Sequence, residues 1–439
     1  KTPLEDWIVD RSGIKERDRD HIEQYQLQRL AETLTYAKRN RRFYSEKLSG
    51  IRQSSLDSLQ DFSNIPFTYP HQISQNPMDF LCVPQKEVSR IVTLNTSGTT
   101  GMGKRICFTK QDLDLTVDFF QFGMSCLTDE SDRVMVLLPG DSYGSIGDLL
   151  KKALGMSNSK CVNYGILADP EDAANAIIKE DITCLVGIPI QILYLSRVRP
   201  DIFKSKIRKV LLSTDYVPEV MIRELHQLYG CKVFTHYGMT EMGYGGGVEC
   251  EALNGYHMRE ADLYFEIVDP VTGDVLPDGQ QGEVVFTTLN RQAMPLIRYR
   301  TGDSASFSEN ACACGTFLKT MTRVSGRIDN QARIGEGIYL YLRELDEVIF
   351  HFREVLDYKA CITEKNLLKI DIISENKEII RDIEFTVQKL LHKKPGHELD
   401  LAVIANPDSR PEKIVNSMIK RKLIDHRMTK PEYTDIKAV

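Results

Sequence analysis

The chain has 439 residues, of which 42% are hydrophobic and 27% charged, as in ordinary globular proteins with two or three domains. Its formal net charge of −6 and the lack of a long apolar run argue against nucleic acid and membranes as partners. Ten cysteines scattered through so long a chain are typical of a reducing compartment, so we expect a cytoplasmic protein, monomeric or homodimeric.

Helix and loop signals fill the first 90 residues, and an alternating pattern follows. Periodic apolar residues predict a packing helix within 14–50, and four prolines make 51–88 rich in loops. From about 110 to 236, short apolar runs alternate with helical patterns. The runs that we expect to be strands are 134–138, 184–188, 210–212 and 232–235. This alternation predicts an α/β fold whose parallel sheet is covered by helices on both faces.

Two further regions complete the chain. Alternating residues between 260 and 325 predict a small antiparallel β-sheet or barrel, and 326–439 has the pattern of a small α+β domain. The helices that we expect in it are 339–350, 378–391 and 411–424. We therefore expect a large N-terminal domain at 1–325, with a β subdomain at about 255–325, and a small C-terminal domain at 326–439.

Residues 96–104 are predicted to bind phosphate. They are Thr96, Ser97, Gly98, Thr99, Thr100, Gly101, Met102, Gly103 and Lys104. Glycine lets the backbone approach a ligand closely, and successive N–H groups and hydroxyls form a nest for an anion. The lysine adds a positive charge. The stretch therefore indicates a site for a nucleoside triphosphate.

Two kinds of phosphate loop compete for this stretch. Gly98 to Lys104 fits the start of the Walker pattern G-x-x-x-x-G-K, but Arg105 stands where Ser or Thr should hold Mg²⁺. Residues 105–109 are rich in β-formers, so we expect a strand there and not the helix that a Walker loop opens. The pattern favours a strand–loop–strand clamp, and a plain glycine-rich hairpin turn is a third alternative.

Polar residues follow the third and fourth predicted strands. They are Ser213, Thr214 and Asp215 after the third, and Tyr237, Gly238, Met239, Thr240 and Glu241 after the fourth. Ligands of parallel sheets bind at the carboxyl ends of the strands. We therefore regard both groups as candidates for the binding site.

Four motifs in this order resemble the adenylate-forming superfamily, and within it the phenylacetate–coenzyme A ligase branch. They are 96–104, 237–241, 299–303 (Tyr-Arg-Thr-Gly-Asp) and 325–329 (Ser-Gly-Arg-Ile-Asp). The resemblance implies that a carboxylate, preferably of an aromatic acid, attacks the α-phosphorus of ATP. Pyrophosphate leaves, and the thiol of coenzyme A then displaces AMP. Such a reaction needs positioning and cations more than a nucleophilic side chain, because charge builds on phosphate oxygens.

The resemblance assigns roles to residues of the nucleotide site. Glu241 would bind Mg²⁺, Thr240 would meet the α-phosphate, and Tyr237 would lie against adenine. Asp303 would accept hydrogen bonds from both ribose hydroxyls, and Arg327 would contact ribose or phosphate. Simpler alternatives are an acid at a helix N-terminus for Glu241, a turn aspartate for Asp303 and a solvated surface arginine for Arg327.

Other residues are candidates by position. The group at 213–215 stands where the family has Gly-Glu-Pro beside adenine. His236 directly precedes Tyr237, and we expect it either to line the acyl pocket or to be a core histidine. Tyr143 and Tyr244 are further candidates for the pocket.

The resemblance also implies a small C-terminal domain that rotates between the two half-reactions. Its pivot matches Asp329. The lysine that assists adenylation matches Lys420, with Lys422 in reserve, although Ile419 replaces the glycine that is usual there. A solvated basic helix face is the alternative explanation of this stretch.

A second constellation consists of Cys250, His257, Cys312 and Cys314. Three thiolates and an imidazole suit tetrahedral Zn²⁺ with no open position, which is typical of structural sites. The metal would tie the loop after Glu241 to the antiparallel sheet. Free cysteines beside an unrelated histidine are the alternative, and an iron–sulfur site would need four thiolates.

We therefore expect an AMP-forming ligase that joins a carboxylic acid to coenzyme A, with ATP as co-substrate, Mg²⁺ as cofactor and structural Zn²⁺. One alternative is an adenylating enzyme that passes the acyl group to a carrier protein or an amine. Others are a nucleotide-binding regulatory protein that has lost catalysis and a Walker-type kinase or ATPase. Only the Walker enzyme would release ADP instead of AMP.

Overall fold

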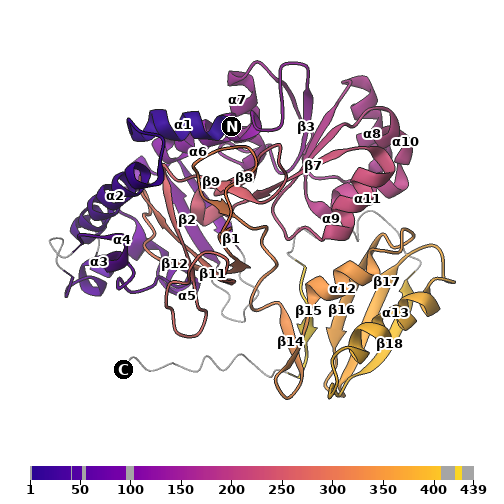
Figure 1. The fold of residues 1–439 in the computed structure, drawn as a ribbon. Coiled ribbons are helices and arrows are strands. Elements are labelled where there is room, and N and C mark those ends of the chain that lie inside the picture. The colour runs from indigo at the N-terminus through magenta and orange to yellow at the C-terminus, as the bar shows by residue number, and fades with distance from the viewer. Residues whose placement is uncertain (1, 41, 52–55, 95–102, 407–420, 428–439) are drawn as a thin grey trace.

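The computed structural model describes residues 2–40, 42–51, 56–94, 103–406 and 421–427. Short and long helices open the chain (Figure 1). They are α1 (Pro3–Ser12), α2 (Arg19–Asn40), α3 (Arg42–Lys47), α4 (Leu59–Phe62) and α5 (Pro70–Gln75), followed by the 3₁₀ turns η2 (Pro77–Phe80) and η3 (Gln85–Glu87). The helix expected within 14–50 is therefore divided between α2 and α3. In the described ranges, no helix combines the length and the apolar character needed to cross a membrane.

An eight-stranded sheet occupies the centre of the fold. Its strands are β3 (Arg133–Leu137), β4 (Lys160–Asn163), β5 (Cys184–Gly187), β6 (Lys209–Leu212), β7 (Lys232–Tyr237), β8 (Gly247–Glu249), β9 (Tyr256–Met258) and β13 (Thr320–Met321). They lie in the order β13-β9-β8-β7-β6-β5-β3-β4. Pairing is parallel from β4 to β7 and antiparallel from β7 to β13. The predicted parallel sheet is confirmed, and three short antiparallel strands that were not predicted extend it.

Helices cover both faces of this sheet, because successive strand residues point to opposite sides. They are α6 (Lys110–Met124), α7 (Ile146–Met156), α8 (Pro170–Lys179), α9 (Pro189–Val198), α10 (Pro200–Ser205) and α11 (Glu219–Tyr229). Val134 and Val136 of β3 are buried in the core that includes α6 and α7. Met135 and Leu137, which alternate with them, are buried in a second core with α8 and α10.

Two antiparallel elements adjoin the large sheet. The hairpin β1 (Arg90–Leu94) and β2 (Lys104–Phe108) flanks the predicted phosphate loop. Because a strand follows the loop and α6 begins only at Lys110, the strand–loop–strand prediction is confirmed at its flanks and the Walker alternative is wrong. The strands β10 (Leu263–Val268), β11 (Gly282–Thr288) and β12 (Tyr299–Ala305) form the predicted antiparallel sheet.

The C-terminal elements form a four-stranded sheet of their own, in the order β18-β17-β16-β19. Its parts and neighbours are β14 (Gln331–Gly335), β15 (Ile338–Tyr341), α12 (Leu342–Ile349), β16 (Asp357–Ile362), β17 (Leu367–Ile373), α13 (Ile380–His392), β18 (Asp400–Asn406) and β19 (Ile424–Asp425). Figure 1 shows them in orange and yellow beside α9 and α11. Arg197 of α9 joins the two regions, because it donates to Phe350 O at 2.6 Å just beyond α12.

Two predicted helices in this region differ from the structure. The segment expected to begin a helix at residue 339 first forms β15. The helix α12 starts at Leu342 because the Glu344 carboxylate accepts a hydrogen bond from the backbone N–H of Tyr341 at 3.0 Å and caps the helix. Ile424, expected at the end of a helix, lies in β19, and residues 411–420 of that segment lie outside the described residues.

Candidate active site

Three residues from distant parts of the chain meet beyond the carboxyl end of β7. Lys104 opens β2, Glu241 lies in the turn η4 (Thr240–Met242), and Tyr299 opens β12. The Lys104 ammonium is in contact with Glu241 Oε1 and donates to the Tyr299 hydroxyl at 3.0 Å. That hydroxyl donates to Glu241 Oε1 at 3.0 Å. The structure thus joins a predicted phosphate-binding lysine to a predicted magnesium-binding carboxylate.

The charge of this group is fixed by its surroundings. Burial alone would raise the pKa of Glu241, but the Lys104 ammonium and the Tyr299 hydroxyl hold that pKa below its ordinary value. Burial, reinforced by the Glu241 charge, raises the pKa of Tyr299 far above its ordinary value, so the phenol stays a hydrogen-bond donor. At neutral pH the site therefore holds one anionic carboxylate, which suits a divalent cation, beside one ammonium group, which suits a phosphate.

Tyr237 and Asp303 form a second polar group next to the first. The Tyr237 hydroxyl donates to Asp303 Oδ2 at 3.0 Å, and an Arg327 terminal nitrogen lies 3.5 Å from Asp303 Oδ1. Arg327 Nε also donates to Asp329 Oδ1 at 3.0 Å. Gly302 has a φ of +75°, a backbone conformation that favours glycine, and a Cβ there would lie 2.8 Å from an Arg327 nitrogen. The four predicted residues of this group do come together.

The predicted residues between Tyr237 and Glu241 form a tight turn. A Cβ on Gly238 would lie 2.0 Å from Tyr244 O, so the chain can fold back on itself only with glycine there. Met239 O accepts from Met242 N at 3.0 Å and from Tyr244 N at 2.9 Å. Thr240 is partly accessible on this turn. The turn therefore presents Thr240 and Glu241 beside each other at the end of β7.

The residues after β6 take different directions. Ser213 is buried, and its hydroxyl lies 2.9 Å from His236 Nδ1. Thr214 has a φ of +79°, which is unusual for threonine and marks a strained turn. Asp215 accepts from the backbone N–H of Arg421 at 3.4 Å. The group at 213–215 is thus divided between the interior of the sheet and the C-terminal region.

Several predicted residues cannot be placed. Thr96, Ser97, Gly98, Thr99, Thr100, Gly101 and Lys420 lie outside the described residues, whereas Lys422 is described and exposed. Its neighbour Arg421 is half-buried, and its guanidinium contacts Asp346 of α12. This contact fixes the chain directly after Lys420 to the C-terminal sheet region.

Sequence reasoning gave no role to two residues of the site. Tyr299 opens one of the four motifs, and that position was its only signal. Arg291 is buried and donates to Glu241 O at 3.1 Å, which holds the η4 turn in place. No sequence pattern pointed to Arg291, because the contact joins two loops that are far apart in the chain.

A small apolar cavity lies on the other side of β7, between this strand, α6 and α7. Ser213 and His236 are the two polar side chains among those that line it. Tyr143 and Tyr244 are not among the lining residues: Tyr143 is 52% exposed, and the Tyr244 ring stacks on Phe108. Of the predicted pocket residues, the structure therefore brings only His236 to the cavity.

Burial makes His236 sensitive to acid. It lowers the pKa of His236 to about 4, so the folded protein keeps the ring neutral while an unfolded chain protonates it near pH 6.5. Stability from this group is therefore complete above pH 6.5 and falls as the pH drops toward 4. We expect wild type to lose roughly 2 kcal/mol more unfolding free energy than His236→Gln between pH 7 and pH 5. Urea unfolding at the two pH values measures this, and equal losses would contradict it.

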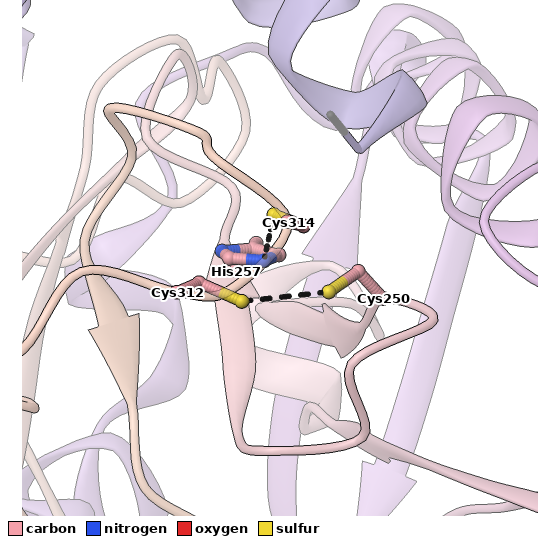
Figure 2. Close-up of side chains that lie close together, drawn as sticks. All are labelled: Cys250, His257, Cys312 and Cys314. Atoms are coloured by element: carbon pink, nitrogen blue, oxygen red, sulfur yellow. Dashed lines mark hydrogen bonds between the residues drawn. The ribbon is translucent and has the colours of Figure 1, made fainter.

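The predicted cysteine and histidine residues form one cluster, drawn in Figure 2. Cys250 follows β8, His257 lies in β9, and Cys312 and Cys314 lie in the loop before β13. The Cys250 and Cys312 sulfurs are 3.7 Å apart, and the Cys314 sulfur is 3.5 Å from His257 Nε2. All four potential ligand atoms lie within 4.8 Å of one another. His257 Nδ1 lies 3.4 Å from Thr320 Oγ1, which leaves Nε2 directed at the cluster.

Comparison with solved structures shows the fold. A 2-hydroxyisobutyryl-CoA ligase, solved in the postadenylation state with 2-HIB-AMP, superimposes with a TM-score of 0.76 over 88% of this chain and 86% of that one, at 20% identity. An anthranilate CoA ligase in complex with anthranoyl-AMP matches with a TM-score of 0.53 over 74% of this chain and 65% of that one, at 17% identity.

Sequence comparison shows the family. Phenylacetate-coenzyme A ligase from Pseudomonas putida is 27% identical over 347 residues, which are 76% of this chain and 77% of that protein. Phenylacetate-coenzyme A ligase from Thermus thermophilus is 28% identical over 364 residues, 79% of each chain. The sequence profile of the AMP-binding enzymes matches residues 34–291, which is more than half of the chain. The chain therefore belongs to the AMP-binding enzyme family.

Proposed function

We propose that the protein is an AMP-forming ligase that adenylates a carboxylic acid and transfers the acyl group to coenzyme A. The observation that carries the proposal is the convergence of Lys104, Glu241 and Tyr299 from three separate motifs, next to Tyr237 and Asp303. Phenylacetate-coenzyme A ligases among the relatives support an acid–thiol ligase. They also favour an aromatic acid, although an aliphatic acid is equally compatible with the apolar cavity.

In this proposal the two polar groups divide the nucleotide between them. Lys104 exchanges Glu241 for a phosphate, and the hydroxyl of Thr240 contacts the α-phosphate. Asp303 accepts from the ribose hydroxyls while Arg327 holds it in place, and Tyr237 lies against the adenine. The residues at 96–101 and 213–215 complete the phosphate and adenine sites, and Lys420, or Lys422 in its place, approaches the reacting carboxylate.

The residues around Glu241 fit a bound Mg²⁺. A carboxylate oxygen is the ligand type that this ion prefers, and Glu241 is already anionic beside a cation. When bound, Mg²⁺ neutralises charge on the phosphate oxygens. Tyr299 keeps its hydrogen bond to Glu241 and orients the carboxylate, and Arg291 holds the backbone of the turn.

Nucleotide product analysis tests the proposal. The protein is incubated with ATP, Mg²⁺, coenzyme A and a panel of aromatic and aliphatic acids, and the products are separated by chromatography. We expect acid-dependent AMP and pyrophosphate together with an acyl-coenzyme A. ADP and phosphate would contradict the proposal. AMP with an acyl group found only on a carrier protein or an amine would support the alternative acceptor.

The domain organisation, the localisation and the oligomeric state belong to the same proposal. We place the boundary between the adenylation domain and the small C-terminal domain at residues 325 and 326, with the β subdomain at about 255–325 and Asp329 as the pivot. The separate sheet of the C-terminal elements supports this division. A cytoplasmic monomer or homodimer stays a prediction.

A second part of the proposal is a structural Zn²⁺ held by Cys250, His257, Cys312 and Cys314. With Zn–S bonds of about 2.3 Å and Zn–N bonds of about 2.0 Å, a tetrahedral site has S···S edges of roughly 3.8 Å and S···N edges of roughly 3.5 Å. The observed separations of 3.7 Å and 3.5 Å match these edges. Four protein ligands leave no position for a substrate, so the metal would be structural. Metal analysis by mass spectrometry should find about one zinc per chain; a folded, metal-free protein would contradict this part.

A further inference from the structure

The polar residues of the apolar cavity form one hydrogen-bonded pair. Ser213 Oγ lies 2.9 Å from His236 Nδ1, and the other ring nitrogen, Nε2, is buried without a hydrogen-bond partner among the described residues. An imidazole nitrogen left in this state costs about 1–3 kcal/mol of stability. The neighbouring side chains Phe119 and Phe120, whose ring centres lie 6.5 Å and 6.3 Å from the imidazole, carry no conventional hydrogen-bonding group.

The position of His236 relates this cavity to the nucleotide site. Neighbouring residues of a strand point to opposite faces, so β7 directs Tyr237 toward Asp303 and His236 toward the cavity. The imidazole also adjoins the turn that presents Thr240 and Glu241, since a Cβ on Gly238 would lie 2.8 Å from His236 Cε1. An acid whose carboxylate lies at that turn would direct its body toward the cavity.

The chemistry of the cavity limits what that body can be. Its wall is apolar apart from Ser213 and His236, and no charged side chain is among the lining residues. A charged substituent would be left without an ion partner and would be costly to bury. The His236 ring is neutral at pH 7 because its pKa is about 4, so Nε2 is either a donor or an acceptor according to which way the Ser213 hydroxyl points. A hydroxyl group fits both cases, because it can donate and accept.

We propose that the acid has an apolar body with one hydroxyl group, and that His236, oriented by Ser213, is the specificity-determining residue that binds this hydroxyl. The inference rests on the proposed function for the statement that the ligand is a carboxylic acid. Its own basis is the unpartnered nitrogen in an otherwise apolar cavity. Removing the hydroxyl from the acid would leave Nε2 unpaired, and removing the imidazole would leave the hydroxyl unpaired.

The test uses matched pairs of acids that differ by one hydroxyl group. Phenylacetate, benzoate and hexanoate are each compared with their monohydroxylated derivatives. Binding is measured by calorimetry with a non-hydrolysable ATP analogue, and acid-dependent AMP formation is measured separately. For the best pair we expect wild type to favour the hydroxylated acid by about tenfold, in both binding and kcat/KM.

Substitutions of His236 and Ser213 test whether this preference depends on the imidazole. We expect His236→Leu to reduce the ratio to about one, and His236→Gln, which keeps a donor and an acceptor, to retain part of it. Ser213→Ala should weaken the preference by freeing the ring. Met124→Leu is the matched control: it changes the apolar wall and should affect both members of each pair alike.

The outcomes separate this inference from the proposed function. Acid-dependent AMP formation without preference for any hydroxylated acid would overturn the inference and leave the ligase proposal intact. An unchanged ratio in His236→Leu would overturn it as well. ADP formation with no binding of any acid would overturn both.

Discussion

Glu241→Gln is expected to lower the rate of acid-dependent AMP formation by about 10²- to 10³-fold. Glutamine keeps the shape of the side chain and can still accept from the Tyr299 hydroxyl, but it removes the negative charge. The Lys104 ammonium then lacks its ion partner, and the proposed Mg²⁺ site lacks its carboxylate. A quenched-flow measurement of AMP in a single turnover tests this, because it separates the adenylation step from release of products.

Loss of activity must be distinguished from loss of folding. Removing one partner of a buried ion pair typically destabilises a protein by about 3–5 kcal/mol, and Lys104 and Glu241 are only 13% and 5% exposed. Combining Glu241→Gln with Lys104→Met removes the unpaired ammonium, so we expect the double variant to recover stability but not activity.

A second buried pair supplies the matched control. Glu266 pairs with Arg298, with side-chain exposures of 1% and 3%, and neither belongs to the two polar groups of the site. Glu266→Gln should be destabilised to a similar degree, yet form AMP at close to the wild-type rate while it is folded. If Glu241→Gln were as active as wild type, the assigned role of Glu241 would be wrong.

The sequence predicted the core of the fold where its pattern is periodic or apolar over enough residues. The strands β3, β5, β6 and β7 are apolar runs of four to six residues, and each was predicted. The strands β8, β9 and β13 have three, three and two residues, which is too short for an alternating pattern. They exist because their backbone groups complete the edge of a sheet already begun by β7, and that depends on tertiary contacts.

The residues of the candidate site were likewise only partly predictable from the sequence. The motifs identified Lys104, Glu241, Tyr237 and Asp303, because the chemistry of phosphates and ribose demands particular residue types in a local arrangement. Their partners were not predictable: Lys104 and Tyr299 are 195 residues apart in the chain and meet only after folding. The pairing of Ser213 with His236 follows from the parallel register of β6 and β7, which sets their ends side by side.

Cys312→Ser is expected to abolish stoichiometric zinc and to lower the melting temperature by roughly 10 °C. Serine is a poor ligand for this ion, and a three-ligand site would no longer tie the loop before β13 to the β8–β9 hairpin. Cys361→Ser is the matched control, because Cys361 is a half-buried free cysteine on β16 outside the cluster. A chelator should lower the melting temperature of wild type and of Cys361→Ser, but not that of Cys312→Ser.

The effect should reach the nucleotide site through the sheet. β8 pairs with β7 at Tyr237 and Gly247, and the Glu249 carboxylate at the end of β8 accepts from Thr235 N at 2.7 Å. Cys250 is the next residue, so a metal bound there would hold the strand that positions the Tyr237 hydroxyl against Asp303. We therefore expect Cys312→Ser to raise the KM for ATP roughly fivefold to tenfold at a temperature where it is folded. A fully stable, zinc-free Cys312→Ser with unchanged KM would show that the four residues do not form a structural metal site.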